Sequence, residues 1–153
     1  MNQSEEVIFV IKKISSELTY EIRKKVLWQH ITNGDYSLPI DNNPSTFHLG
    51  AFINEKLISI GTFVNQNNPK FNSKKQYRLR AMATEKKNRI KGAGKALFIE
   101  GLKILKKKDI KILWCDARIN AIPFYEKLNM ISLDNVYEII NIGPHKTMYI
   151  DIK

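Results

Sequence analysis

Residues 77–108 read YRLRAMATEKKNRIKGAGKALFIEGLKILKKK, and this stretch decides the fold. Over residues 77–84 the side chains alternate between two chemically different faces, which is the period-two pattern of a strand. After the polar run 85–88, apolar residues recur at helical spacing from Ala93 to Leu105. The spacing predicts a strand that leads through a glycine-bearing turn into a long amphipathic helix.

The turn between this strand and this helix carries two glycines and several cations. Glycine is unfavourable inside a helix, so Gly92 and Gly94 at a helix start indicate close approach of a ligand to the backbone. The first N–H groups of the helix and its dipole attract anions, and Arg89, Lys91 and Lys95 add positive charge. We therefore expect a phosphate or pyrophosphate site. A P-loop and a dinucleotide fingerprint are excluded, because the run lacks a Gly-Lys-Ser/Thr ending and a third glycine. A basic helix start without a ligand is the alternative.

The composition is that of a globular protein with an excess of positive charge. A chain of 153 residues with 43% hydrophobic and 26% charged residues suits one domain, expected over residues 1–153. The net charge of +10 favours a polyanionic partner or a phosphorylated cofactor, and a lysine-rich solvated surface is the alternative.

Cysteine usage and the first residues predict the compartment. Cys115 is the single cysteine, so it cannot form an internal disulfide, and no Cys/His cluster has metal-ligand spacing. We expect a cytoplasmic protein without a metal. The apolar run 7–11 is too short to cross a membrane, so no membrane partner is expected.

The remaining periodicities predict the order of elements. Strands are expected over residues 7–11, 46–53, 57–64, 110–115, 136–142 and 148–152. Helices are expected over residues 17–30 and 121–128, and a polar, turn-rich loop over residues 33–45. No repeat or linker interrupts this order, which predicts one α+β domain.

Two motifs in this order resemble a known family. Arg89-x-x-Gly92-x-Gly94 after the strand, and Asn120-x-x-x-x-Tyr125 further along, resemble the acetyl-CoA core of the GNAT superfamily of N-acetyltransferases. Five further stretches are similar to its glyphosate N-acetyltransferase-like branch: Phe47-His48-Leu49-Gly50, Lys56-Leu57-Ile58-Ser59-Ile60, Lys75-Gln76-Tyr77, Leu113-Trp114-Cys115-Asp116-Ala117-Arg118 and Gly143-Pro144-His145. The resemblance implies a single GNAT-like α+β domain. Its central sheet would be mixed and mostly antiparallel, with about six to seven strands flanked by helices.

The resemblance also implies that acetyl-CoA is the co-substrate and indicates where it binds. Backbone N–H groups of residues 90–95 would hold the CoA pyrophosphate. The strand end 82–84 would pair with the pantetheine arm and polarise the thioester carbonyl. The cofactor-binding residues expected on this basis are Met82, Ala83, Thr84, Arg89, Ile90, Lys91, Gly92, Ala93, Gly94, Lys95 and Asn120.

Acetyl transfer to an amine needs a base for the amine and an acid for the departing thiolate. The resemblance assigns these roles to His145 and Tyr125. From the residues alone, His145 beside Gly-Pro has a turn or packing role as its alternative, and Tyr125 has a place in the core. His48 is interpreted as structural, and Cys115 as a small buried hydrophobic residue.

Two arginines and a tryptophan indicate the charge and size of the acceptor amine. Arg80 and Arg118 are expected to bind an anionic acceptor, because guanidinium groups match carboxylate and phosphonate oxygens bidentately. Pairing with internal acids such as Asp116 is the alternative. The segment 22–28 resembles one that ends, in the branch, with a substrate-binding arginine, and this chain has Trp28 there. The change favours a smaller or mono-anionic amine such as an amino acid, with an apolar part against Trp28.

The predicted function is therefore acetyl transfer from acetyl-CoA directly to the primary amine of a small anionic substrate, by a monomer or homodimer. One alternative is a protein or peptide acetyltransferase acting on lysine or an N-terminus, which needs an open groove where the loop 33–45 is expected to cover the site. A non-catalytic nucleic-acid-binding module is the other. No nucleic-acid partner is expected, because no aromatic residues interleave with the lysines that such a module would use: Lys86, Lys87, Lys106, Lys107, Lys108 and Lys111.

Overall fold

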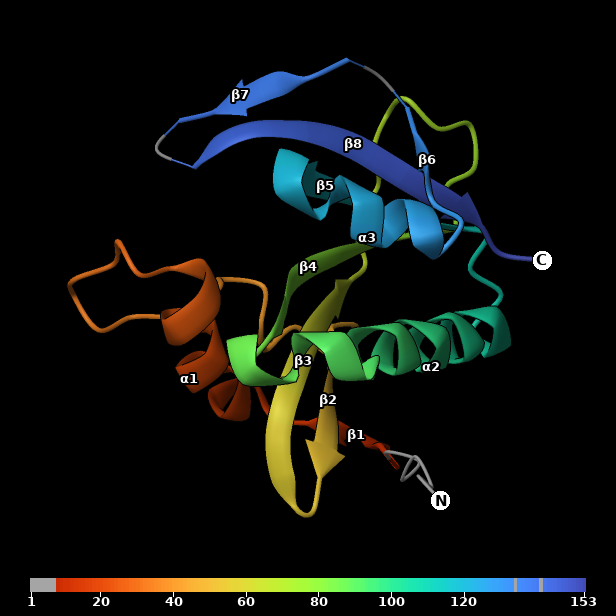
Figure 1. The fold of residues 1–153 in the computed structure, drawn as a ribbon. Coiled ribbons are helices and arrows are strands. Elements are labelled where there is room, and N and C mark those ends of the chain that lie inside the picture. The colour runs from red at the N-terminus through yellow and green to blue at the C-terminus, as the bar shows by residue number, and fades with distance from the viewer. Residues whose placement is uncertain (1–7, 134, 141) are drawn as a thin grey trace, which may run out of the picture. The chain divides into compact units, whose positions relative to one another are not determined.

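The computed structural model describes residues 8–133, 135–140 and 142–153, which form an α+β fold (Figure 1). The strands are β1 Val10–Ile14, β2 Phe47–Ile53, β3 Lys56–Val64, β4 Gln76–Thr84, β5 Ile112–Arg118, β6 Ile131–Ser132, β7 Tyr137–Ile139 and β8 Gly143–Asp151. The helical elements are η1 Ser16–Thr19, α1 Tyr20–Ile22, η2 Arg23–Leu27, η3 Lys86–Lys91, α2 Ala93–Lys107, η4 Ile119–Ala121 and α3 Ile122–Lys127.

The strands hydrogen-bond in one mixed sheet. Among the described residues the sheet has eight strands, in the order β1-β2-β3-β4-β5-β8-β6, with β7 also paired to β8. β4 and β5 are parallel, whereas β1 with β2 and β5 with β8 are antiparallel. The predicted fold class, a mixed and mostly antiparallel sheet flanked by helices, is confirmed.

The chain divides into two compact units. Unit 1 comprises residues 8–62 and 81–101, and unit 2 comprises the described residues of 63–80 and 102–153. β3, β4 and α2 each contribute residues to both units.

In unit 1, backbone pairing sets the strand bounds. The expected first strand, residues 7–11, is shifted: β1 runs over Val10–Ile14, and Val7 lies outside the described residues. Val10 is 47% exposed, so pairing with β2 and not burial of the apolar run places this strand. β2 and β3 turn through Asn54 and Glu55, whose φ values of 48° and 67° match a two-residue hairpin turn.

The helix expected over residues 17–30 is instead three short helical elements, η1, α1 and η2. The last has wide π-helical turns: the Trp28 N–H donates to the Arg23 carbonyl, five residues back, at 2.8 Å. In such wide turns, residues five apart lie close to the same face of the helix, so Arg23 and Trp28 fall on one face. The Arg23 guanidinium lies 5.4 Å from the Trp28 ring centroid.

A buried ion pair joins this helical segment to the loop 33–45. Arg23, which is 0% exposed, donates to both carboxylate oxygens of Asp41 at 2.7 and 2.9 Å and to Thr62 Oγ1 at 3.0 Å. His48 completes the network, with Nε2 3.0 Å from the Asp41 carbonyl and Nδ1 2.8 Å from the Thr62 hydroxyl. Because a carbonyl only accepts, Nε2 carries the proton, and the structural role expected for His48 fits.

The charge of Asp41 depends on these contacts. Burial raises the pKa of Asp41, but hydrogen bonds from Arg23 and the Leu38 N–H, with the positive charge of Arg23, outweigh burial and lower the pKa overall. The carboxylate therefore stays ionised beside the guanidinium.

In unit 2, β5 pairs along its whole length with β8, from Ile112 opposite Asp151 to Arg118 opposite His145. α3 packs against β5 (Figure 1). Two predicted strands, 136–142 and 148–152, correspond to β7 and to a longer β8 that begins at Gly143. The two-residue β6 was not predicted, because it is too short to show a period.

The buried ion pair gives a test of stability. We expect Asp41→Asn to lower the free energy of unfolding by about 3–5 kcal/mol, because it leaves a buried guanidinium without its counter-charge. Asp109→Asn is the matched control: Asp109 pairs with Lys75 and Lys111 at the exposed surface, and its loss should change little. Chemical denaturation measures both, and equal losses would contradict the role of the buried pair.

The difference in free energy of unfolding between wild type and Asp41→Asn should shrink as the pH falls below 3.8, the ordinary pKa of Asp. Because the pKa of Asp41 is lowered in the folded state, the stability that the carboxylate contributes is lost only in acid.

Candidate active site

The glycine-bearing turn of unit 1 has the backbone of an anion site. Gly92 has φ of +87°, the left-handed region that favours glycine, and a Cβ there would meet only Phe9 Cε2 at 3.9 Å. Backbone conformation therefore requires this glycine, whereas Gly94 is buried in the first turn of α2. Arg89 and Lys95 are exposed around the turn. The first N–H groups of α2, from Ala93 onward, have no partner within the helix.

The end of β4, the other expected cofactor-binding element, is irregular. Ala81 has φ of 50°, and a left-handed residue inside a strand marks a β-bulge. The Ser59 hydroxyl donates to the Ala83 carbonyl at 3.1 Å and lies 2.8 Å from Thr84 Oγ1. Sequence alternation gave no sign of this bulge, because alanine rarely adopts that conformation.

The pairing of β5 with β8 separates the two expected catalytic side chains. Opposed residues share a face and successive residues alternate, so Arg118 and His145 lie on one face and Cys115 with Met148 on the other. Tyr125 of α3 lies on the Cys115 face, because α3 packs against β5 and Cys115 acts electrostatically on Tyr125. His145 and Tyr125 therefore lie on opposite faces of the unit 2 sheet.

His145 is held in one tautomer. The ring is 4% exposed, and Nδ1 lies 2.7 Å from the Gly143 carbonyl. A carbonyl only accepts, so Nδ1 carries the hydrogen, and Nε2 of the neutral ring is left as the acceptor. The Gly-Pro context suggested a loop, but His145 belongs to β8 because it pairs with Arg118 and Tyr137.

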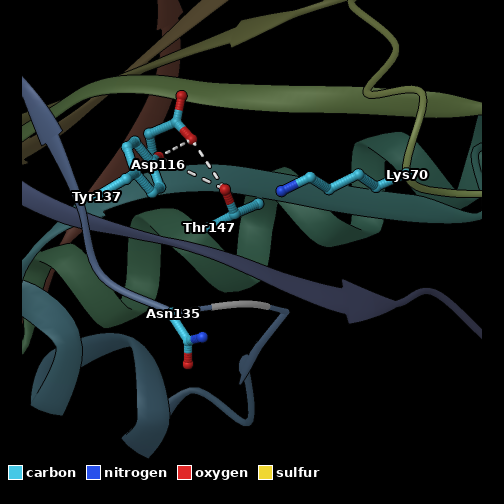
Figure 2. A pocket seen from close by; sticks show the side chains of 5 residues that line it. All are labelled: Lys70, Asp116, Asn135, Tyr137 and Thr147. Carbon is cyan, nitrogen blue, oxygen red and sulfur yellow. Dashed lines mark hydrogen bonds between the residues drawn. The ribbon is translucent and has the colours of Figure 1, made fainter.

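Near His145, the Asp116 carboxylate accepts hydrogen bonds from residues of three strands. Asp116 accepts a hydrogen bond from Arg78 at 2.6 Å. It also accepts hydrogen bonds from Thr147 at 3.2 Å and from the Tyr137 hydroxyl (Figure 2). The internal acid named as an alternative partner for Arg80 and Arg118 thus binds Arg78. The fold brings these residues together, because β4 runs parallel to β5 with Arg78 opposite Trp114, two residues before Asp116.

Tyr125 and Cys115 are both kept protonated by burial. Burial raises the pKa of Tyr125, which is 7% exposed, well above its usual value, and the neighbouring Cys115 raises it further. Burial likewise raises the pKa of the Cys115 thiol. The phenol can therefore act as a proton donor, and the reading of Cys115 as a small buried side chain is confirmed.

The other predicted residues lie at the surface or partly buried. Arg80 and Arg118 are half-buried near the ends of their portions of β4 and β5 in unit 2. Asn120 is exposed within η4, and α3 starts after Ala121 without a side-chain cap. Across the described ranges, no three His, Cys, Asp or Glu side chains gather to hold a metal. No helix in the described part of the chain is long and apolar enough to cross a membrane.

Comparison with known proteins decides the family. The sequence profile of the Acetyltransferase (GNAT) family matches residues 13–130. The chain belongs to the GNAT acetyltransferase family. The uncharacterized N-acetyltransferase YitI of Bacillus subtilis (strain 168) is 36% identical over 139 residues, covering 91% of this chain and 93% of YitI.

Solved structures agree with this GNAT fold. An aminoglycoside 6'-N-acetyltransferase complexed with coenzyme A superposes with a TM-score of 0.76 at 12% identity, over 94% of this chain and 97% of that one. FeeM, an N-acyl amino acid synthase from uncultured soil microbes, has a TM-score of 0.75 at 12% identity, over 95% and 92% of the two chains. This GNAT protein is an acetyl-CoA-dependent N-acetyltransferase.

The glycine-bearing turn fits the pyrophosphate of acetyl-CoA. A left-handed Gly92, open helical N–H groups and the exposed cations Arg89 and Lys95 supply the donors and charge that a pyrophosphate requires. Gly34, in the loop 33–45, also has a left-handed φ of +77° and therefore provides a matched control for a binding test at Gly92.

We expect Gly92→Ala to weaken acetyl-CoA binding about tenfold, because it disturbs the turn that aims the N–H groups. Gly34→Ala carries the same backbone penalty of roughly 1–2 kcal/mol, since alanine disfavours the left-handed region equally at both positions. Calorimetric titration with acetyl-CoA should give a weakened Kd for Gly92→Ala alone. Equal affinities of the two variants for acetyl-CoA would show that the turn does not take part in binding.

Proposed function

We propose that this enzyme transfers the acetyl group of acetyl-CoA directly to the primary amine of a small anionic acceptor of the amino-acid type. The observation that carries the proposal is the pairing of Arg118 with His145 across β5 and β8. Directly opposed residues have Cβ atoms about 4.5–5.5 Å apart, so a base and a guanidinium stand side by side on one face. An α-amino acid carries an amine and a carboxylate on one carbon, so a single small substrate can present one group to each of these two side chains.

The proposed reaction uses one residue on each face. The nitrogen of the neutral amine forms a bond to the thioester carbonyl carbon, and Nε2 of His145 takes the proton that this nitrogen loses as the amide forms. Backbone N–H groups of residues 82–84 are the proposed donors to the carbonyl oxygen as it gains charge. The carbon–sulfur bond breaks, and the Tyr125 phenol gives its proton to the departing thiolate. The base thus serves the nitrogen of the tetrahedral intermediate and the acid serves its sulfur.

Within the family, we infer kinship to the glyphosate N-acetyltransferase-like branch, with a changed acceptor. Trp28 stands where the branch has a substrate-binding arginine, and Arg23 of the same segment binds Asp41. Both features favour a carboxylate over a dianionic phosphonate. A cytoplasmic location, the absence of a metal or nucleic-acid partner, and a monomeric or homodimeric state stay predictions.

A screen of acceptors tests the substrate class. Thiol release should give a higher kcat/KM for amino acids than for aminophosphonates of the same carbon skeleton, because a second negative charge lacks the arginine that Trp28 replaces. A clear preference for the phosphonates would contradict the proposed class. Lysine-containing peptides outperforming free amino acids would point to a protein acetyltransferase.

The proposed base is tested by His145→Ala. We expect kcat to fall by roughly 10²–10⁴ and the pH profile of kcat to change, because the proposed base is removed. His30→Ala, at an exposed histidine, is the control and should keep both the rate and the pH profile. Full activity of the His145 variant would place the base elsewhere.

The proposed acid is tested by Tyr125→Phe. Because burial keeps the phenol protonated, its loss should lower kcat while the Kd for acetyl-CoA stays close to that of wild type. Tyr149→Phe is the matched control, since that ring lies 5.2 Å from Phe71 and has no proposed part in the chemistry. An unchanged kcat for Tyr125→Phe would exclude proton donation by this residue.

A further inference from the structure

Tyr137 lies next to the proposed base in the sheet of unit 2. It pairs directly with His145 between β7 and β8, and opposed residues of neighbouring strands share a face. Its ring stacks on the His145 imidazole, with centroids 6.2 Å apart and planes inclined by 27°. This separation is within the range of about 4.5–7 Å over which aromatic rings attract each other. The imidazole therefore packs against a ring that the proposed reaction does not itself use.

The orientation of the His145 imidazole needs more than its hydrogen bond to the backbone. The bond between Nδ1 and the Gly143 carbonyl, at 2.7 Å, fixes one corner of the ring. A tilt of the ring about this contact would still move Nε2, the atom that must come within hydrogen-bond distance of the acceptor nitrogen. A second ring stacked on the imidazole opposes that tilt.

Tyr137 is held by its hydroxyl group. β7 has only three residues, and the apolar residues on either side of it, Val136 and Ile140, are exposed, so their burial does not anchor the strand. The Tyr137 hydroxyl instead donates to Asp116 of β5, across β8, and lies 3.4 Å from Thr147 Oγ1 (Figure 2). Both ends of the Tyr137 side chain are thus fixed.

Asp116 is a well-braced anchor for that hydroxyl. Its Oδ2 accepts a hydrogen bond from Arg78 at 2.6 Å, while its Oδ1 accepts from Tyr137 and Thr147. The Arg78 guanidinium in turn lies 4.9 Å from the Trp114 ring centroid. Contacts from β4, β5 and β8 therefore hold the carboxylate that holds Tyr137.

We propose that Tyr137 is a positioning residue for the acetyl transfer. Asp116 holds its hydroxyl, and its ring fixes the plane of the His145 imidazole so that Nε2 meets the acceptor amine. The inference rests on the proposed function, because it assumes that His145 is the base.

The first test separates kcat from binding, in a thiol-release assay with acetyl-CoA and the L-amino acid of highest kcat/KM in the acceptor screen. Tyr137→Leu should lower kcat by roughly two- to tenfold, the kinetic equivalent of one aromatic pair. KM for the amino acid and the Kd for acetyl-CoA should stay close to those of wild type. Tyr137→Phe should lose less, because it keeps the ring and removes only the hydroxyl. Tyr149→Leu, which removes a ring packed on Phe71, is the control and should keep kcat.

A double-mutant cycle distinguishes positioning of the base from a merely structural role. In the His145→Ala background, Tyr137→Leu should leave the residual kcat unchanged, because the ring then has no base to orient. A structural role would lower kcat by the same factor in both backgrounds. If Tyr137→Leu does not fold, as judged by circular dichroism, Tyr137→Phe takes its place in the cycle with the same two outcomes.

The results separate this inference from the proposed function. If His145→Ala lowers kcat but the Tyr137 variants keep it, or lower it equally in both backgrounds, Tyr137 does not position the base while the proposed function stands. If His145→Ala keeps full activity, or if no amino acid is acetylated, the proposed function and the positioning role both fall.

Discussion

Seven consecutive residue pairs join β5 to β8, and the chemistry of unit 2 depends on their register. A slip by one residue would move every side chain to the other face. Cys115, Ala117 and Met148 are buried on one face, and Ile112 and Trp114 are buried on the other. The register places Asp116, Thr147 and His145 on the face of Trp114, where the proposed base and the Asp116 cluster lie.

Unit 1 has its own central interaction, the ion pair between Arg23 and Asp41. It holds the loop 33–45 to the helical segment, and Thr62 and His48 complete its hydrogen bonds. Burial of Arg23 also explains the departure from a regular helix, because the wide turn of η2 brings Trp28 over the guanidinium. Arg23 is thus engaged within the protein.

The sequence predicted the elements whose signals are periodic or depend on glycine. The strand over 77–84 and the helix that begins after Gly92 are both found, because strand pairing and backbone conformation constrain which residue types can occupy these positions. It did not predict features that arise from long-range contacts. Arg23, in the wide turns of η2, binds Asp41 in a distant loop, and His145 pairs with Arg118 in a strand. The bulge at Ala81 was not predicted, because the position holds alanine and not the glycine that would indicate a left-handed residue.

The Asp116 cluster was missed for a related reason. Arg78 was grouped with the other polar residues of its strand, and only the fold brings it to Asp116 together with Tyr137 and Thr147. The resemblance to GNAT enzymes identified candidate residues one by one, whereas their distribution over two faces is a property of the strand register. That distribution links the sequence motifs to a mechanism in which the amine and the thiolate are served by different residues.

The most direct test is a crystal structure with a bisubstrate analogue in which the CoA sulfur is joined through an acetyl linker to the nitrogen of an amino acid. The account predicts that this nitrogen lies within hydrogen-bond distance of His145 Nε2, and that the sulfur lies within hydrogen-bond distance of the Tyr125 hydroxyl, on the opposite face of β5. A complex in which both atoms lie on the same face, or in which the nitrogen is remote from His145, would contradict it.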